Sequence, residues 1–328
     1  MVPQKKRQQL QQAVVIGGTG QVGMRLVQEL RAFQPQLVNL VATSRKVEDG
    51  EPRGPLSSTG DHWWQLLTDI RWSALDLESI AGVTGALRDL DDLVLSGIPG
   101  ALFLSAAYTN VDGCEKDPAL NERVNLKHTQ EVLAWAYERG LKPVFFSTDY
   151  VFDGTSGPYR EEDPRSPICA YGRAKAQVEE WMEGCTPEGL ILRTTGVYDL
   201  IEGSKNFLMQ MMAAGAEGRT VKLPADQEAN PVWAVELARA AVELAAHDAS
   251  GIFHVAGARQ MARTDFAKLI AEEFGLENLK VEGIQTASLG QAAKRPLKGG
   301  LLSAKVEREL SWAPRAPEEV FREMKSPL

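Results

Sequence analysis

Residues 13–30 read AVVIGGTGQVGMRLVQEL: four apolar residues, a glycine-rich turn, and apolar side chains that then recur at helical spacing. A short apolar run of this kind is typical of a buried parallel strand. Strand, glycine turn and helix in succession are the context of a dinucleotide-binding loop, in which glycine lets the backbone approach pyrophosphate and the helix N-terminus offers free N–H groups. The glycines Gly17, Gly20 and Gly23 follow the spacing G-x-x-G-x-x-G. A glycine turn without a ligand is the alternative interpretation.

A second stretch, residues 146–175, contains three polar side chains that suit proton transfer to a carbonyl. Tyr171 and Lys175 are four residues apart and would share one face of a helix. Thr148 follows an apolar run typical of a strand, so we expect all three side chains to converge at the C-terminal edge of a sheet. The Lys175 ammonium would there favour the phenolate and lower the pKa of Tyr171. The Tyr-x-x-x-Lys spacing alone is a weak signal, because an ordinary helix face would also produce it.

The residues after the next apolar run, 37–42, bear on the choice of cofactor. A site that prefers NAD would place Asp or Glu at the end of this strand, to bind the ribose 2′-hydroxyl. The chain instead has Thr43-Ser44-Arg45-Lys46, and Arg45 could pair with a 2′-phosphate through its forked donors. We therefore predict NADPH, with NADH less favoured; a solvated loop charge is the competing interpretation of Arg45. Asp76 ends a predicted third strand and could contact the adenine.

The composition excludes several classes of protein. The 328 residues are 44% hydrophobic and 24% charged, which is ordinary for a soluble globule. A net charge of −8 argues against nucleic-acid binding. The three cysteines and four histidines lack disulfide or metal-ligand spacing, so no metal site is predicted. Residues 1–12 lack the apolar core of a signal peptide and no run is long enough to span a membrane, so we expect a disordered extension and a cytoplasmic protein.

The alternation of strand and helix patterns predicts an α/β fold with a Rossmann-like, doubly wound parallel sheet. After Thr195 the pattern changes to helices with irregular connections, which predicts a smaller, interleaved C-terminal substrate domain. The predicted boundaries are 13–195 for the NADP-binding domain, with 231–256 returning to it, and 196–230 plus 257–328 for the substrate-binding domain. The roles of the 48–61 loop and of Trp63-Trp64 cannot be read from the sequence.

Over nearly its whole length the chain resembles the extended short-chain dehydrogenases/reductases, and within them the dTDP-4-dehydrorhamnose reductase family. The stretches that support this are GGTGQVG at 17–23, SAAYTNVD at 105–112, STDYVFDG at 147–154, YGRAK at 171–175 and Arg295-Pro296. The resemblance implies that Tyr171 is the general acid to a carbonyl oxygen, and that Lys175 binds the nicotinamide ribose. It also implies that Thr148 hydrogen-bonds the substrate oxygen and that NADPH supplies hydride.

Motifs and resemblance together give two sets of contact residues. Those expected at the cofactor are Gly17, Thr19, Gly20, Gln21, Val22, Gly23, Ser44, Arg45, Asp76, Leu77, Ala106, Ala107, Tyr108, Tyr171 and Lys175. Those expected at the substrate are Thr109, Asp149, Val151, Phe152, Gly196, Asn206 and Arg295. Arg295 is a candidate for a diphosphate contact, with a surface arginine before a proline turn as the equal alternative.

Gly196 stands where the resembled family has a tryptophan that helps line the sugar pocket, so the substrate need not be the rhamnose precursor. We predict an NAD(P)-dependent oxidoreductase of the EC 1.1.1 type that reduces a keto group on a nucleotide-activated or sugar-like substrate. The sequence leaves open whether the protein forms a homodimer. Residues 158–163 and 251–254 also resemble the NADP-binding regulatory β-subunit of methionine adenosyltransferase, which is the alternative. The third candidate function is a sugar-nucleotide dehydratase or epimerase, although Tyr150 replaces the glutamate usual in dehydratases.

Overall fold

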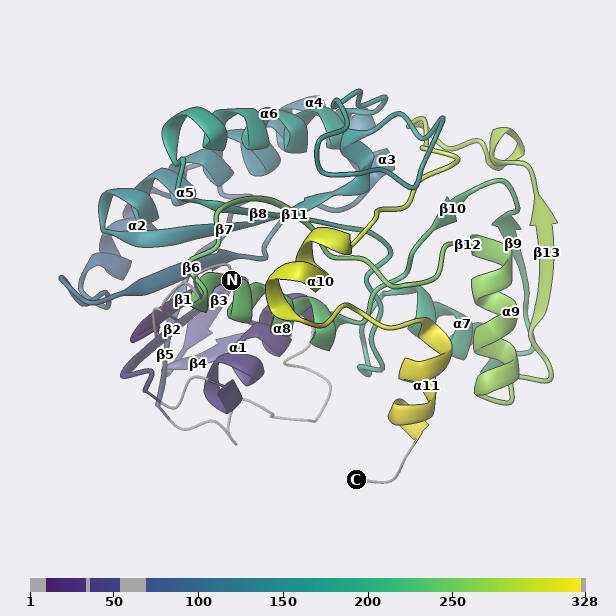
Figure 1. The fold of residues 1–328 in the computed structure, drawn as a ribbon, viewed down its shortest axis with the longest axis horizontal. Helices are drawn as coiled ribbons and strands as arrows, with labels where there is room; N and C mark the ends of the chain where they lie inside the picture. Colours follow the sequence, from purple (N-terminus) through teal and green to yellow (C-terminus); the bar gives the residue numbers. More distant parts are fainter. Residues whose placement is uncertain (1–9, 34–35, 54–68, 326–328) are drawn as a thin grey trace.

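A seven-stranded parallel sheet forms the centre of the protein (Figure 1), in a computed structural model that describes residues 10–33, 36–53 and 69–325. The strand order is β11-β8-β7-β6-β1-β2-β5, and every pairing within it is parallel. The predicted doubly wound sheet is confirmed, and its order reverses between β1 and β6, where open α/β sheets bind ligands. The strands are β1 (Gln12–Ile16), β2 (Asn39–Ser44), β5 (Ile70–Ala74), β6 (Gly100–Leu104), β7 (Leu141–Thr148), β8 (Leu190–Thr194) and β11 (Gly251–His254).

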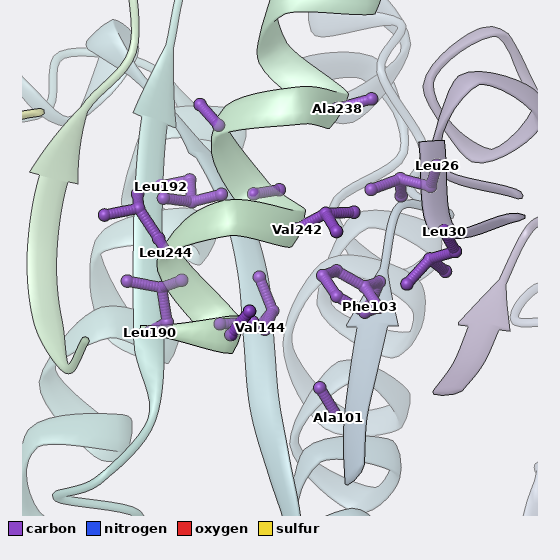
Figure 2. Packing of buried hydrophobic residues seen from close by; sticks show 14 of the residues in the cluster. Leu26, Leu30, Ala101, Phe103, Val144, Leu190, Leu192, Ala238, Val242 and Leu244 are labelled. Atoms are coloured by element: carbon purple, nitrogen blue, oxygen red, sulfur yellow. The ribbon is translucent and has the colours of Figure 1, made fainter. Parts of the chain in front are cut away.

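Helices cover both faces of this sheet (Figure 1). One face carries α1 (Gln21–Phe33), α8 (Ala234–Ala246) and α10 (Ala304–Leu310); the other carries α2 (Thr84–Asp91), α5 (Thr129–Glu138) and α6 (Ala170–Cys185). Because both faces are covered, the central strands β1 and β6 are buried along their whole length rather than at alternate positions. In Figure 2, Phe103, Val144 and Leu192 lie between the sheet and α8, where they pack with Val242.

A helical region runs from Pro118 to Glu138 but is not uniform. It consists of α4 (Pro118–Glu122), a π-helical segment (Arg123–His128) and α5, and α3 (Val111–Lys116) precedes it. Within the π-helical segment the Asn125 side chain binds the Tyr108 backbone, donating to its carbonyl at 2.9 Å and accepting from its N–H at 3.0 Å. A π-helical turn often occurs at a functional site, and this one positions the segment that follows β6.

A smaller unit is built from two separate parts of the C-terminal half (Figure 1). Its elements are α7 (Phe207–Ala216), α9 (Arg263–Glu273), α11 (Pro317–Lys325), the parallel pair β9 (Thr220–Pro224) and β13 (Lys280–Ile284), the antiparallel pair β10 (Glu228–Ala229) and β12 (Met261–Ala262), and the 3-10 turn Thr286–Leu289. Between these parts the chain returns to the main sheet as α8 and β11, so the predicted interleaving is confirmed. The two small sheets were not predicted, because strands this short and this exposed have no apolar pattern.

Two predicted boundaries are wrong. The predicted extension 1–12 ends too late: β1 begins at Gln12, whose side chain donates to the Leu95 carbonyl at 2.7 Å, and Leu10 is buried. Inside the predicted 48–61 loop, β3 (Lys46–Glu48) and β4 (Glu51–Arg53) pair as a hairpin. Residues 1–9, the rest of that loop and Trp63-Trp64 lie outside the described residues. In the described part of the chain no helix is both long and apolar enough to cross a bilayer.

A fully buried ion pair joins α6 to the sheet. The Nη2 atom of Arg193 on β8 lies 2.7 Å from Oε2 of Glu179 on α6, and both side chains are excluded from solvent. The Ser147 hydroxyl on β7 also donates to Glu179, and Arg165 Nε reaches it at 2.7 Å. Arg193 Nε donates to the same carboxylate at 3.1 Å, so four donors converge on it, as a buried charge requires.

The same network extends to β11. Arg193 Nη1 donates to the Glu161 carbonyl at 3.2 Å and lies 3.3 Å from Nε2 of the buried His254. The other ring nitrogen of His254 lies 3.2 Å from the Tyr159 carbonyl. Burial, and then the neighbouring Arg193 charge, lower the pKa of His254 from 6.5 to about 3, so the ring is neutral.

We expect Glu179→Gln to lower the free energy of unfolding by about 3–5 kcal/mol, because it leaves Arg193 charged and unpaired in the interior. Urea denaturation followed by circular dichroism measures the loss. Glu183→Gln is the matched control on the same helix: its carboxylate is half exposed and pairs with Arg165, so it should cost under about 1 kcal/mol. Equal losses in the two variants would contradict a special role for the buried pair.

The pKa of His254 gives a pH dependence with a definite sign. The pKa of His254 is lower in the folded than in the unfolded state. Its contribution to the free energy of unfolding is therefore fully present above about pH 6.5 and is lost as pH falls towards 3. His254→Gln lacks this linkage. The stability gap between wild type and variant should therefore shrink by about 2 kcal/mol between about pH 7 and about pH 5. A gap that stays constant in urea titrations would show that His254 is not buried in its neutral form.

Candidate active site

The predicted proton-transfer residues meet at the carboxyl end of β7. Thr148 is the last residue of β7, and Tyr171 lies in the first turn of α6, whose N-terminus is capped by Cys169 Sγ accepting from the Gly172 N–H at 3.5 Å. Thr148 and Tyr171 line one cleft of about 500 Å³ together with the glycine loop at Gly20–Gly23. The sequence prediction that these two hydroxyls share a site therefore agrees with the geometry.

Lys175 lies beneath this cleft rather than in it. Its side chain is 3% exposed, its Nζ donates to the Phe146 carbonyl at 2.9 Å, and it stands 5.9 Å from the centre of the Tyr171 ring. Burial lowers the pKa of Lys175 to about 8. The ammonium is thus bound to a backbone carbonyl, which fixes its position relative to Tyr171.

The predicted lowering of the Tyr171 pKa is wrong for this structure. Burial raises the pKa of Tyr171 well above its usual value, and nearby Cys114 and Asp149 raise it further. The reason is that the desolvation of a phenolate in this 9%-exposed position outweighs an ammonium that is itself desolvated and bound elsewhere. Tyr171 is consequently protonated at neutral pH, the form that can donate a proton.

A second cavity, of about 180 Å³, lies where β1, β2, β5 and β6 end. Its lining contains nine predicted cofactor residues, which are Gly17, Thr19, Gly20, Ser44, Arg45, Asp76, Leu77, Ala106 and Ala107. The glycine loop is tightly folded here: a Cβ on Gly23 would lie 2.1 Å from the Gly17 carbonyl oxygen, so only glycine fits. Gln21, Val22 and Gly23 line the larger cleft beside it. The two cavities meet at Gly20 and could hold the two halves of a dinucleotide.

Arg45 is placed as predicted but has a partner that the sequence did not reveal. Its Nη2 lies 2.7 Å from Oε1 of Glu78, and both side chains are substantially exposed, so the pair is weak and exchangeable. Glu78 lines the same cavity, held by its own N–H donating to Asp76 at 3.0 Å. Glu78 follows β5 in a loop, where no sequence pattern marks it.

Tyr108, also predicted at the cofactor, is not among the residues that line these two cavities. Asn125 binds its backbone, and its ring packs beside Cys114.

Four predicted substrate residues line the larger cleft, namely Thr109, Asp149, Gly196 and Asn206. Asp149 accepts hydrogen bonds from Thr195 at 2.8 Å and Thr148 at 3.3 Å, and burial raises its pKa to about 6. Asn206 caps α7, accepting from the Met209 N–H at 3.2 Å. The segment before α7 is also fixed to α1, through Ser204 donating to Gln21 at 2.8 Å.

Two other substrate predictions do not fit the structure, and a third residue has a partner that the sequence did not reveal. Val151 and Phe152 are fully buried in a core cluster, where Phe152 stacks on Tyr159 with ring centres 4.2 Å apart, so their side chains pack the fold and cannot touch a substrate. Arg295 is not a surface arginine: it is 9% exposed, and its Nη2 is bound to Asp112 at 2.9 Å. Asp112 thereby occupies one nitrogen of the guanidinium predicted to meet a diphosphate, while Nη1 of Arg295 has no hydrogen-bond partner among the described residues.

A third cavity, of about 150 Å³, shares Asp149, Tyr150, Thr195 and Gly196 with the larger cleft. Gly196 has φ +55°, and a Cβ there would lie 3.3 Å from Pro231, so the backbone favours glycine. The rest of the lining comes from the smaller unit and includes Phe207, Met261, Arg263 and Phe266. Sequence reasoning missed these residues because β12 and the start of α9 had no recognisable pattern. Among the described residues, no group of three or more His, Cys, Asp or Glu side chains is placed to hold a metal ion.

Comparison with known sequences gives a consistent set of relatives. Residues 11–326 match the family model of the RmlD substrate binding domain. A probable low-salt glycan biosynthesis reductase, Agl14, from Haloferax volcanii is 37% identical over 62% of this chain and 70% of its own. A dTDP-4-dehydrorhamnose reductase from Sinorhizobium fredii is 32% identical over 71% of this chain and 79% of its own.

Solved structures share the fold over almost the entire chain. A hypothetical dTDP-4-dehydrorhamnose reductase from Sulfolobus tokodaii has a TM-score of 0.72 at 26% identity, covering 94% of this chain and 98% of its own. A dTDP-4-dehydrorhamnose reductase from Bacillus anthracis, in complex with NADP, has a TM-score of 0.75 at 22% identity, covering 96% of this chain and 98% of its own.

Proposed function

Since the chain belongs to the RmlD substrate binding domain family, we propose that it is an NADPH-dependent reductase of a keto group on a sugar linked to a nucleotide. The observation that supports this most directly is the shared cleft. The hydroxyls of Thr148 and Tyr171 line the same 500 Å³ cavity as the glycine loop. Several relatives are named as reductases of dTDP-linked keto sugars.

The residues at the sheet edge fit a dinucleotide. The glycine loop has the close backbone packing that pyrophosphate binding needs, and it begins α1, whose N-terminus favours an anion. Arg45 and Ser44 stand where the adenosine ribose of a dinucleotide would lie, and Arg45 could exchange the exposed Glu78 for a 2′-phosphate. When bound, NADPH supplies the hydride.

The protein's own groups would then manage the proton. The Thr148 and Tyr171 hydroxyls hydrogen-bond the carbonyl oxygen, and Tyr171 donates its proton to that oxygen as the C–H bond forms. The raised pKa of Tyr171 keeps this proton in place until negative charge develops on the substrate oxygen. Lys175, fixed on the Phe146 carbonyl, lies where it can stabilise the resulting phenolate. The sum is carbonyl, NADPH and H⁺ giving alcohol and NADP⁺.

We expect Tyr171→Phe to lower kcat about 10²–10⁴-fold, because it removes the proton donor while leaving the ring. NADPH binding, measured by quenching of protein fluorescence, should be nearly unchanged. The assay is NADPH oxidation with dTDP-4-dehydro-6-deoxy-L-mannose, and Tyr137→Phe on α5 is the control. Loss of NADPH binding in Tyr171→Phe would mean that the side chain is structural. Wild-type turnover also separates a reductase from an NADP-binding regulatory subunit.

The 2′-phosphate assignment has a separate test. Arg45→Ala should weaken NADPH binding about tenfold, roughly 1.4 kcal/mol, and leave NADH binding almost unchanged, because only NADPH has the phosphate. Lys46→Ala, the next residue, is the control. Equal losses for both cofactors in fluorescence titrations would contradict this role.

A further inference from the structure

Arg263 is a cation without a partner at the edge of the candidate active site. It is the first residue of α9 and lines the third cavity. Its guanidinium carbon lies 4.4 Å from the centre of the Phe207 ring. Its backbone N–H is bound to the Gln227 carbonyl at 2.9 Å, but within residues 10–33, 36–53 and 69–325 its guanidinium makes neither a hydrogen bond nor an ion pair. The side chain is therefore held on an aromatic surface while its five donors stay available.

Neither carboxylate of the cavity lining is bonded to Arg263. Two carboxylates belong to the cavity lining, and both are engaged: Asp149 accepts from Thr148 and Thr195, and Glu228 accepts from Gln260 at 3.1 Å. Arg263 as a whole is exposed, while desolvation of its guanidinium lowers its pKa and the Arg295 charge lowers it further. The cavity lining thus combines two carboxylates with one guanidinium whose donors none of the described residues occupies.

The cavity that contains Arg263 continues into the catalytic cleft. Both are lined by Asp149, Tyr150, Thr195 and Gly196. Gly196 has no side chain to separate them. Tyr150 links the two ends: its ring lies 6.1 Å from that of Tyr171, and the charges of Arg295 and Arg263 both lower its pKa, against a larger increase from burial. One ligand can therefore extend from Tyr171 to Arg263.

We propose that Arg263 binds the diphosphate of a nucleoside-diphosphate-linked substrate whose sugar carbonyl lies at Thr148 and Tyr171. A planar guanidinium with free forked donors pairs with phosphate oxygens in a bidentate manner. Arg295, the sequence candidate for this contact, is bound to Asp112 at 2.9 Å through Nη2 and has a buried, unpartnered Nη1, whereas Arg263 lines the cavity itself. This inference rests on the proposed reductase function and adds the residue that selects nucleotide-linked over free sugars.

The test compares thymidine diphosphate with thymidine, by isothermal titration calorimetry at saturating NADP⁺. Arg263→Met keeps an unbranched side chain against Phe207 but removes the charge, and should weaken thymidine diphosphate binding at least tenfold while thymidine binding stays within twofold. Arg263→Lys should lie between the two. Arg219→Met, an exposed arginine of the same unit paired with Glu217, is the matched control and should bind like wild type. Thermal melting confirms that each variant is folded.

Equal binding of thymidine diphosphate by wild type and Arg263→Met overturns the proposal, as does wild type that binds no thymidine diphosphate. An equal loss of thymidine affinity also overturns it, because the residue would then act on the nucleoside. Keto-sugar reduction is measured on the same preparations. Turnover with an unchanged KM in Arg263→Met supports the reductase function and shows that Arg263 does not bind its substrate. If wild type shows no turnover but still binds thymidine diphosphate more tightly than thymidine through Arg263, the reductase function is overturned while the diphosphate site at Arg263 is supported.

Discussion

The buried ion pair between Glu179 and Arg193 positions the helix on which the candidate chemistry depends. Glu179 lies two turns beyond Tyr171 on α6, and its carboxylate collects donors from β7, β8 and the loop at Arg165. Arg193 extends the network to the neutral His254 on β11. A charge this deep is tolerable only with every partner in place. The network therefore sets the position of α6 against three strands, and with it the position of Tyr171 above the end of β7.

Burial also decides the electrostatics of the cleft. Around Tyr171 the protein places Asp149, Tyr150 and two thiols, Cys114 and Cys169, all of which raise the pKa of its hydroxyl. Desolvation works in the opposite direction on Lys175. Both groups are thus pushed towards their neutral forms. A neutral phenol suits a reductase, since it holds the proton that the reduced carbonyl oxygen needs.

The interleaved chain path places the second half of the site. The chain leaves the sheet after β8, builds part of the smaller unit, returns as α8 and β11, and leaves again (Figure 1). Each segment that leaves the sheet contributes residues to the third cavity. Gly196 and Phe207 come from the first segment, and Arg263 comes from the second. The smaller unit therefore brings the Arg263 guanidinium close to the sheet edge that supplies the hydroxyls of Thr148 and Tyr171.

The sequence by itself determined the parallel sheet, the glycine loop and the shared site of Thr148 and Tyr171, because strand and helix patterns are local properties of the chain and Thr148 lies at the end of a recognisable strand. It did not reveal Glu78, Arg263 or the two small sheets, since these lie in short or irregular segments without periodicity. It also misjudged Val151 and Phe152 and did not reveal the pair of Arg295 with Asp112, because these neighbours come into contact only on folding. The burial of a side chain depends on which distant segments of the chain cover it. Only the tertiary structure therefore decided which groups are buried and how their pKa values shift.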